Sequence, residues 1–267
     1  QATSSDRFVM RPLSASAPRV VVTRPAPDHL ALCDALRERG FAAIHSPAVE
    51  RVADPHDLQA RRARSLAQCG LVIVTSPYAA ALLLEVVPAE LARRLEFLTP
   101  GFGTARVLER AGCRVSFPEA GGTSEDLLRS PVLRSVHEGV VGIVGAPGGR
   151  RLLDRELGTR GIRVERVDLY HRRDCAPTPA LIEALRSGRP LVVLVSSVGG
   201  FEALDGGLEP GLRAGWRRSS FIVSSQRVAE RCRRAGIREI VLADGASDAA
   251  MLAALDRVPD CRRATRD

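Results

Sequence analysis

Six short segments of small, hydroxylated or glycine residues carry the chemistry that this sequence offers. Each follows an apolar run typical of a buried strand and precedes a segment with a helical pattern. They are Thr23–Pro25, Thr75–Pro77, Pro100–Thr104, Gly145–Arg151, Ser196–Gly200 and Ser224–Arg227. Free N–H groups at a helix N-terminus bind anions, and small side chains let an anionic oxygen approach the backbone. The six segments therefore predict a ligand with several negative groups.

Some residues of these segments would present backbone N–H groups to the ligand, and two arginines would add positive charge. The candidates from the segments themselves are Thr23, Arg24, Gly101, Gly145, Ser225 and Arg227. Arginine suits this task because its planar guanidinium pairs well with carboxylates. The alternative is that Ser and Thr at helix starts act as ordinary N-caps and that the arginines are simply solvated.

No residue set in this chain suits covalent catalysis, a metal or a nucleotide. No Ser-His-Asp or Cys-His set stands out, and the segment at 145–151 lacks the spacing of both common glycine-rich phosphate loops. The six cysteines are at least 29 residues apart and the five histidines are dispersed, so no zinc pattern arises. We therefore expect neither metal nor cofactor, and we expect catalysis to rest on binding, orientation and electrostatics.

The charge of the chain favours a small polyanion as its partner. The formal net charge is +8, and every one of the 39 basic residues is arginine, a bias that a GC-rich genome also produces. The arginines are scattered, and two Tyr and one Trp offer little surface for stacking bases. These features argue against nucleic acid, while an excess of positive charge favours anionic ligands.

Hydropathy and the chain ends indicate a cytoplasmic protein. No apolar run reaches the roughly 18 residues needed to cross a bilayer. Residues 1–18 lack the apolar core of a secretory signal and are expected to form a disordered tail, with a second tail at 259–267. Thiols this widely spaced in an unsecreted chain are expected to stay reduced.

The two halves of the chain carry the same landmarks in the same order. The offsets are 121 residues for Gly40 and Gly161 and for Ser76 and Ser197, 124 for Gly112 and Gly236, and 123 for Ser124 and Ser247. Four ordered matches at nearly one offset indicate a tandem duplication.

Each half alternates strand-like and helix-like segments. The continuous apolar run Leu71–Val74 is typical of a parallel strand covered on both faces. Helical stripes follow such runs; Asp28–Arg39 is one, ended by Gly40, and Ser124 is expected to cap another. The alternation predicts an α/β fold with doubly wound parallel sheets, whose ligands bind beyond the carboxyl ends of the strands. Two similar lobes would place the ligand in a cleft between them.

The order and spacing of these segments resemble the uroporphyrinogen-III synthase family. The resemblance begins with VVVTRPAPDHLALCDALRERG and continues through LVIVTSPYAA, GFGTARVLERAG, SEDLL, DLYHRR, LVVLVSS and VSSQRVAERCRRAG. Single motifs are weak, whereas the ordered set, from about Arg19 to Leu255, is specific.

The resemblance implies two Rossmann-like or flavodoxin-like lobes joined by a two-stranded linker. Lobe 1 would comprise residues 19–46 and 173–258, lobe 2 residues 53–166, and the linker strands residues 47–52 and 167–172. Each repeat would donate its first strand–helix unit across the linker, which makes the layout compatible with the duplication.

The resemblance also implies the reaction. The substrate would be hydroxymethylbilane, a linear tetrapyrrole with many carboxylates, and the product a macrocycle in which the last pyrrole ring is inverted. The terminal hydroxyl leaves as water and no cofactor is needed. Nothing in the sequence demands more than a monomer.

One catalytic residue follows from the resemblance. Tyr170, in DLYHRR, matches the linker-strand tyrosine of the family, and its implied role is a hydrogen bond to the departing hydroxyl. A phenol is a weak acid at neutral pH, so the alternative is a packed linker tyrosine.

Further binding residues are implied by the match to the family motifs. Thr104 matches the threonine after the family glycine, and the strand-end hydroxyl pairs match Thr75, Ser76, Ser196 and Ser197. Backbone amides there would hold acetate and propionate groups. The chain departs from the family at Pro100, and at Ser224–Arg227, where many members have a glycine-rich threonine segment.

Two other functions fit the same fold. A non-catalytic two-lobed binding or regulatory module would bind the tetrapyrrole and leave ring closure to spontaneous chemistry. A periplasmic-type small-ligand receptor would need an export signal, which the sequence does not show.

Overall fold

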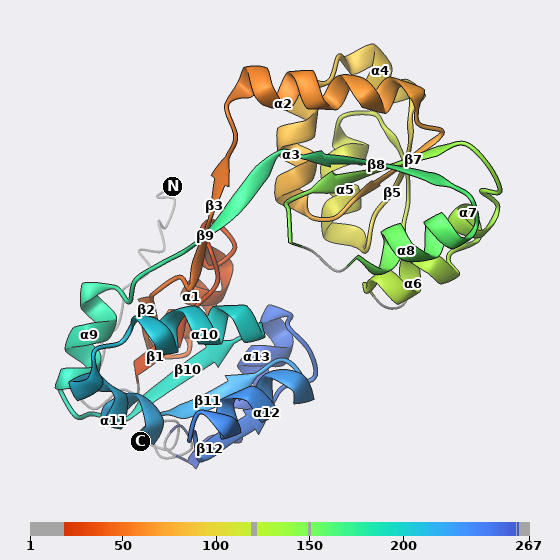
Figure 1. The fold of residues 1–267 in the computed structure, drawn as a ribbon. Coiled ribbons are helices and arrows are strands. Elements are labelled where there is room, and N and C mark those ends of the chain that lie inside the picture. The colour runs from red at the N-terminus through yellow and green to blue at the C-terminus, as the bar shows by residue number, and fades with distance from the viewer. Residues whose placement is uncertain (1–18, 119–121, 149–150, 260, 262–267) are drawn as a thin grey trace, which may run out of the picture. The chain divides into compact units, whose positions relative to one another are not determined.

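The computed structural model describes residues 19–118, 122–148, 151–259 and 261 (Figure 1). They belong to two compact units: unit 1, residues 1–50 and 173–267, and unit 2, residues 51–172. The disordered tail expected at 1–18 lies outside the described residues. Of the tail expected at 259–267, Pro259 and Cys261 are described, and Cys261 is buried in the core of unit 1.

Unit 1 is built on a parallel sheet with the strand order β12-β11-β10-β1-β2. Its central strand β10 is apolar throughout and fully buried, and the neighbouring β11 is buried along its whole length, because helices cover both faces. The strands are β1 (Arg19–Val22), β2 (Ala42–His45), β10 (Leu191–Val195), β11 (Ser220–Val223) and β12 (Glu239–Leu242).

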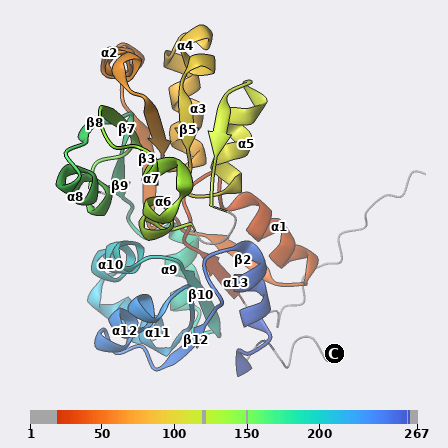
Figure 2. The same cartoon turned by 90° about the vertical axis from the view of Figure 1, so that its right-hand side faces the viewer.

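Alternate residues of these strands feed two separate cores. Val21 and Val193 point to the core under α9–α12, whereas Val20 and Val192 point to the core under α1 and α13. Figure 2 shows α10–α12 on one side of the sheet and α1 with α13 on the other. The helices are α1 (Leu30–Glu38), α9 (Pro179–Arg186), α10 (Val198–Gly207), α11 (Pro210–Arg218), α12 (Gln226–Arg234) and α13 (Asp248–Leu255).

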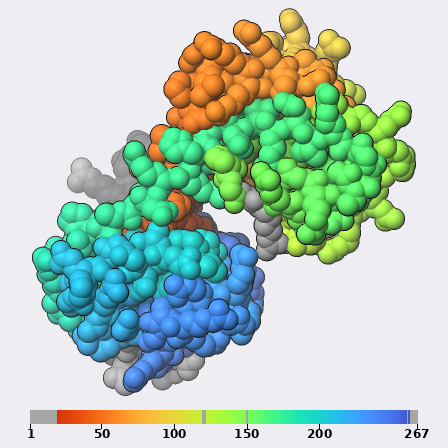
Figure 3. All heavy atoms as spheres, in the orientation of Figure 1, coloured from red at the N-terminus to blue at the C-terminus, as the bar shows by residue number. Residues whose placement is uncertain are grey.

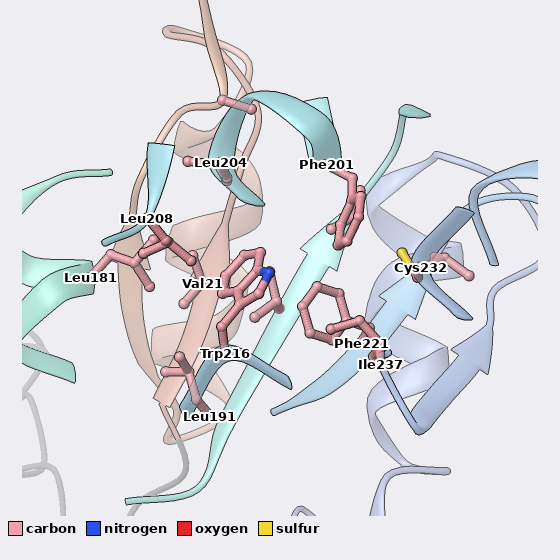
Figure 4. Close-up of a cluster of buried hydrophobic side chains, with 14 of the residues drawn as sticks. Val21, Leu181, Leu191, Phe201, Leu204, Leu208, Trp216, Phe221, Cys232 and Ile237 are labelled. Atoms are coloured by element: carbon pink, nitrogen blue, oxygen red, sulfur yellow. The ribbon is translucent and has the colours of Figure 1, made fainter. Parts of the chain in front are cut away.

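Three aromatic rings form the centre of the larger core of unit 1 (Figure 4). The ring of Trp216 lies 4.9 Å from that of Phe221 in an edge-to-face arrangement and 6.4 Å from that of Phe201. All three side chains are fully buried. In the space-filling view, the atoms of the C-terminal part of the chain, in blue, cover much of the visible face of this unit (Figure 3).

Unit 2 repeats the architecture with the strand order β6-β5-β4-β7-β8, again all parallel. Helices α2–α5 and the 3-10 helix η1 cover one face, and α6–α8 cover the other. The strands are β4 (Leu71–Val74), β5 (Glu96–Leu98), β6 (Arg114–Ser116), β7 (Val140–Gly145) and β8 (Arg163–Asp168). The helices are α2 (His56–Ala63), η1 (Arg64–Gln68), α3 (Pro77–Val86), α4 (Ala89–Arg94), α5 (Phe102–Arg110), α6 (Ser124–Arg129), α7 (Pro131–Arg134) and α8 (Leu152–Thr159).

The two units are joined by a separate two-stranded antiparallel sheet of β3 (Val49–Ala53) and β9 (Tyr170–Asp174). These strands start later than the expected 47–52 and 167–172. Val167 and Asp168 still pair with β7, so they extend the unit 2 sheet and do not belong to the linker.

The strand orders show how the two repeats combine. In unit 1, β1 and β2 come from the first repeat and β10–β12 from the second, whereas in unit 2 β4–β6 come from the first and β7 and β8 from the second. The helix-ending glycines match as well, because Gly40 and Gly161 both have a positive φ, of 81° and 76°. The α/β prediction with two parallel-sheet lobes is confirmed.

One expected helix start is wrong by a residue. Thr123, not Ser124, caps α6: its hydroxyl accepts the N–H of Asp126, and the Asp126 carboxylate accepts the N–H of Thr123 at 2.9 Å. Such a reciprocal capping box satisfies two backbone donors at once. The N-cap equivalent to Thr123 in the second repeat is Ser247, at the start of α13. The offset between these two caps is 124 residues, the same as between Gly112 and Gly236.

We expect the stability of unit 1 to depend strongly on Trp216. Trp216→Ala should cost about 3–5 kcal/mol in the free energy of unfolding, because a large buried ring is removed. Trp216→Phe should cost much less, since ring packing is kept and an indole N–H that has no partner in the described part of the chain is lost. Chemical denaturation followed by circular dichroism measures both; equal losses would contradict this account.

Candidate functional site

The predicted segments gather at one edge of each sheet. In unit 2, β4 pairs with both β5 and β7, so Thr75, Gly101 and Gly145 follow or end neighbouring strands. In unit 1, β10 pairs with β1 and β11, which places the segments starting at Thr23, Ser196 and Ser224 side by side in the same way. Three of the six segments therefore meet in each unit, at the carboxyl edge where such folds bind ligands.

Capping distinguishes these helix starts from one another. Ser76 and Ser197 are N-caps whose hydroxyls accept the N–H groups of Ala79 and Gly200, each at 3.1 Å. For these two residues the alternative interpretation as ordinary caps describes what their side chains do.

Two other helices start without a side-chain cap. The N-cap of α5 is Gly101 and that of α12 is Ser225, and neither makes a capping hydrogen bond. First-turn N–H groups have no partner inside the helix, so these helices leave donors for a ligand. The two positions are equivalent in the two repeats, and α1 and α8, which follow two others of the six segments, also start without a side-chain cap.

Tyr170 is packed in the core of unit 2, and 2% of its surface is exposed. Its hydroxyl lies 3.3 Å from the Ser76 hydroxyl at the start of α3. The ring of Tyr78 meets the Tyr170 ring edge-on at 4.9 Å, and the guanidinium of Arg51 lies 4.7 Å from the centre of the Tyr78 ring. The structure therefore fixes the ring tightly and places the phenol oxygen beside a predicted binding residue.

A polar cluster that the sequence analysis missed holds the backbone before Tyr170. The side-chain amide of Gln59 donates to the Leu169 carbonyl at 2.9 Å, and Arg62 donates to the Asp168 carbonyl at 2.6 Å. Gln59 is buried, which is unusual for its residue type and is explained by these bonds. A polar stretch on a short helix gives no sequence signal for this role.

Asp54 completes this cluster as an anion. Its carboxylate accepts hydrogen bonds from Arg62 at 2.5 Å and from His171 at 3.1 Å. Burial would raise the pKa of Asp54, but the hydrogen bonds from His171 and Arg62 together lower the pKa below its usual value.

Thr75 and Gly145 fit against each other at the carboxyl edge of β4 and β7. The Thr75 hydroxyl donates to the Val144 carbonyl at 3.0 Å, and a Cβ on Gly145 would overlap that hydroxyl oxygen. The Thr75 N–H also donates to the Val144 carbonyl. Glycine at position 145 therefore makes room for the threonine, and Thr75 has its own polar groups engaged.

Thr104 and Gly101 lie at the start of α5. Thr104 is buried, with 4% of its surface exposed, and its N–H donates to the Gly101 carbonyl at 3.2 Å. The same carbonyl accepts the Thr99 hydroxyl, which fixes the turn between β5 and the helix. Phe102 and Gly103 are the exposed residues of this turn.

In unit 1, two of the three predicted binding residues Thr23, Arg24 and Arg227 use their side chains in contacts within the protein. Thr23 is buried and donates to the Leu194 carbonyl at 2.7 Å. Arg24 pairs with Asp248 and donates to the Ala246 carbonyl, so it anchors the start of α13. Arg227 is exposed and makes no ion pair within the described part of the chain, so it is free to meet an anion.

Ser196 and Ser225 complete the unit 1 edge. The Ser196 carbonyl accepts the Ser224 hydroxyl at 2.9 Å, which ties the ends of β10 and β11 together. Ser225 starts α12 with an extended backbone and no side-chain cap.

Two histidines that are far apart in the sequence stack against each other in unit 1. The rings of His29 and His45 are parallel within 4° and 3.5 Å apart, and His45 Nε2 lies 2.8 Å from the Arg24 carbonyl. Burial and the neighbouring His45 lower the pKa of His29.

Among the described residues no group of His, Cys, Asp and Glu side chains could hold a metal ion, and no helix is long and apolar enough to cross a bilayer.

Known proteins resemble this chain over most of its length. Residues 31–253 match the model of the family described as uroporphyrinogen-III synthase HemD. The chain is 29% identical over 247 residues to the uroporphyrinogen-III synthase of Escherichia coli (strain K12) and 31% over 249 residues to that of Salmonella typhimurium (strain LT2). Each alignment covers 88% of this chain and 99% of the relative.

Solved structures share the fold as well. A variant of uroporphyrinogen III synthase from the extremely thermophilic bacterium Thermus thermophilus superimposes with a TM-score of 0.62 at 22% identity, covering 91% of this chain and 98% of that one.

We expect Thr75 and Gly145 to be coupled in a double-mutant cycle. Gly145→Ala should cost about 1–3 kcal/mol, because the new Cβ overlaps the threonine hydroxyl. Thr75→Ala should cost about 1 kcal/mol through its lost hydrogen bond. The double variant should cost less than the two single costs together, measured by urea unfolding; strict additivity would contradict the packing described here.

We expect His29 to make stability depend on pH near neutrality. Because its pKa is lowered on folding, the unfolded chain binds the proton more readily, so the free energy of unfolding falls as pH drops below about 6.5. The lowered pKa values of Asp54 and Asp154 act only below about pH 4. His29→Gln should flatten the curve between pH 8 and 5, whereas the exposed-site control His137→Gln should not. An unchanged slope in His29→Gln would refute this origin.

Proposed function

Because this chain belongs to the uroporphyrinogen-III synthase family, we propose that it closes hydroxymethylbilane into uroporphyrinogen III with loss of water. The reaction makes it a hydro-lyase of tetrapyrrole synthesis. It breaks the bond to the terminal hydroxyl and forms the last ring-to-ring carbon bond, with the terminal pyrrole inverted.

Folding the substrate is the main task that this chemistry sets. Loss of the hydroxyl leaves an electron-rich azafulvene that closes with little covalent help, and the hydroxyl takes up a proton to leave as water. A protein can therefore catalyse the reaction by holding the chain in the reactive shape. The substrate carries a carboxylate on each arm of each ring, so such holding requires many anion contacts.

The observation that carries this proposal is that α5 and α12, at equivalent places in the two repeats, both start without a side-chain cap. The first turns of α5 and α12 keep free N–H groups, next to Thr104 in unit 2 and Arg227 in unit 1. Both helices are nine residues long, so each has a dipole that favours a carboxylate at its start. We propose that each binds one or more acetate or propionate groups.

We propose that the Tyr170 hydroxyl hydrogen-bonds the departing hydroxyl of the substrate. Its position beside Ser76 supports this role, since the Ser76 oxygen accepts the Ala79 N–H and the Ser76 hydroxyl can donate to the phenol oxygen, which leaves the phenol proton for the substrate. The buried ring and the Gln59–Arg62 contacts to the preceding carbonyls would hold the phenol in place at little entropic cost. Thr75, Ser76, Ser196 and Ser197 would contribute mainly by shaping the strand ends.

We propose that the protein works as a monomer in the cytoplasm, with no nucleic-acid partner. None of the six cysteines forms a disulfide, which suits a reducing compartment. Large exposed apolar side chains among the described residues are limited to Leu30, Phe102 and Leu242, too few for an obligate interface. The lobe boundaries expected from the family would follow the division at residues 50/51 and 172/173.

The experiment that tests the function is incubation with hydroxymethylbilane followed by separation of the product isomers. The type III isomer should dominate. The type I ring forms without an enzyme. If it is the only product, this protein does not catalyse ring closure, and the alternative function, a non-catalytic tetrapyrrole-binding module, replaces the proposed one.

Tyr170→Phe should lower kcat by about 10- to 100-fold, within the range of a lost hydrogen bond to a reacting group. The free energy of unfolding should change by about 1 kcal/mol or less, because the ring packing remains. The matched control is Tyr78→Phe, which removes the other tyrosine hydroxyl and keeps its ring contact with Tyr170. Equal rates in wild type and Tyr170→Phe would remove this residue from the mechanism.

A further inference from the structure

Large apolar side chains are exposed at three places in the described residues, and all three lie at the carboxyl edge of a sheet. Leu30 begins α1, Phe102 begins α5, and Leu242 ends β12, with 53%, 57% and 42% of their surfaces exposed. Isolated exposed apolar residues are common on proteins, but a random scatter would not favour this edge. A ligand with apolar surface explains the shared location.

Phe102 is the most exposed of the three and the only aromatic one. Its ring lies 6.1 Å from the ring of Phe117, tilted by 60°, and the guanidinium carbon of Arg106 lies 5.4 Å from its centre. Phe117 follows the last residue of β6, so the two rings come from neighbouring strand ends. They form a small aromatic surface at the edge of unit 2.

A pocket of about 400 Å³ adjoins this surface. Its apolar lining includes Leu98, Phe117 and Val132, and its polar lining includes Ser116 and Arg129. An apolar hollow with a few polar groups at its border is typical of a small-ligand site.

Two arginines beside the rings have guanidinium groups to offer an anion. Arg106 contacts Phe102 and has no ion pair within the described part of the chain. Arg129 contacts one Asp126 oxygen at 3.2 Å, while the other oxygen of Asp126 accepts the N–H groups of Gly122 and Thr123. The Arg129 side chain is 75% exposed, so a ligand can approach it from solvent.

We propose that Phe102, Phe117 and Arg106 form a subsite for one pyrrole ring of the tetrapyrrole and a carboxylate arm of that ring. A pyrrole ring has flat, electron-rich faces that pack on a phenyl ring, and its carboxylate arms need a cation near the ring plane. Arg106 provides this cation, because its contact with the Phe102 ring holds the guanidinium beside the same surface. Phe102 therefore binds the pyrrole ring by packing against it, and Arg106 binds the carboxylate arm by its charge.

This subsite rests on the proposed function, and its test uses two readouts. The first is steady-state ring closure of hydroxymethylbilane, and the second is direct binding of uroporphyrin III, the oxidised macrocycle, followed by its own fluorescence anisotropy. Phe102→Ala should raise KM and the uroporphyrin Kd about five- to tenfold with kcat within about twofold, as expected for a lost ring contact. Phe102→Tyr, which keeps a ring, should stay within about twofold of wild type on both.

The arginine is tested in the same assays with a control on the same helix. Arg106→Gln should raise Kd about three- to fivefold and reduce the loss of binding between low and high salt, because one charge contact is removed. Arg110→Gln, an exposed arginine one turn further along α5, should change neither. All these positions are exposed, so thermal unfolding should match wild type and show that each variant is folded.

The outcomes separate the two proposals. An active wild type with unchanged KM and Kd in Phe102→Ala would overturn the subsite alone. If the wild type does not close hydroxymethylbilane, and Phe102→Ala still weakens the binding of uroporphyrin III, the proposed ring closure is overturned and the subsite is supported. An equal effect of Arg106→Gln and Arg110→Gln would show general charge attraction and overturn the role of Arg106.

Discussion

Neither repeat of this chain can complete a sheet by itself. β1 pairs with β10 in unit 1, and β4 pairs with β7 in unit 2, so each sheet joins strands from both halves of the sequence. The chain must therefore pass from one unit to the other twice, and it does so through β3 and β9. The second passage starts at Tyr170, which places this tyrosine where a linker strand leaves a buried core.

The linker start is held by unusually many polar contacts. Gln59 and Arg62 bind the two carbonyls before Tyr170, and the ionised Asp54 holds Arg62 and His171. A buried amide and a partly buried carboxylate are costly unless their hydrogen bonds are complete. Their concentration around one tyrosine fixes its ring and supports a role for its hydroxyl that depends on position.

Helix capping divides the strand-end loops into two kinds. At α3 and α10 a serine side chain satisfies the first turn, whereas at α5 and α12 the first-turn donors have no side-chain cap. The division is the same in both repeats. Duplication has thus kept two serine-capped helix starts and, at α1, α5, α8 and α12, four without a side-chain cap, and the exposed Phe102 belongs to the second kind.

Local patterns were enough to predict the fold class, the duplication and the strand ends, because these follow from apolar runs and from glycines and serines at helix ends. The position of the linker strands was missed by a few residues, since Val167 and Asp168 look the same whether they extend a sheet or leave it. Capping by Thr123 instead of Ser124 was missed because serine is the more favoured N-cap of the two adjacent residues. The roles of Gln59, of the stacked His29 and His45, and of Gly145 beside Thr75 were decided only by tertiary structure. Each depends on contacts between segments far apart in the chain, which no local pattern records.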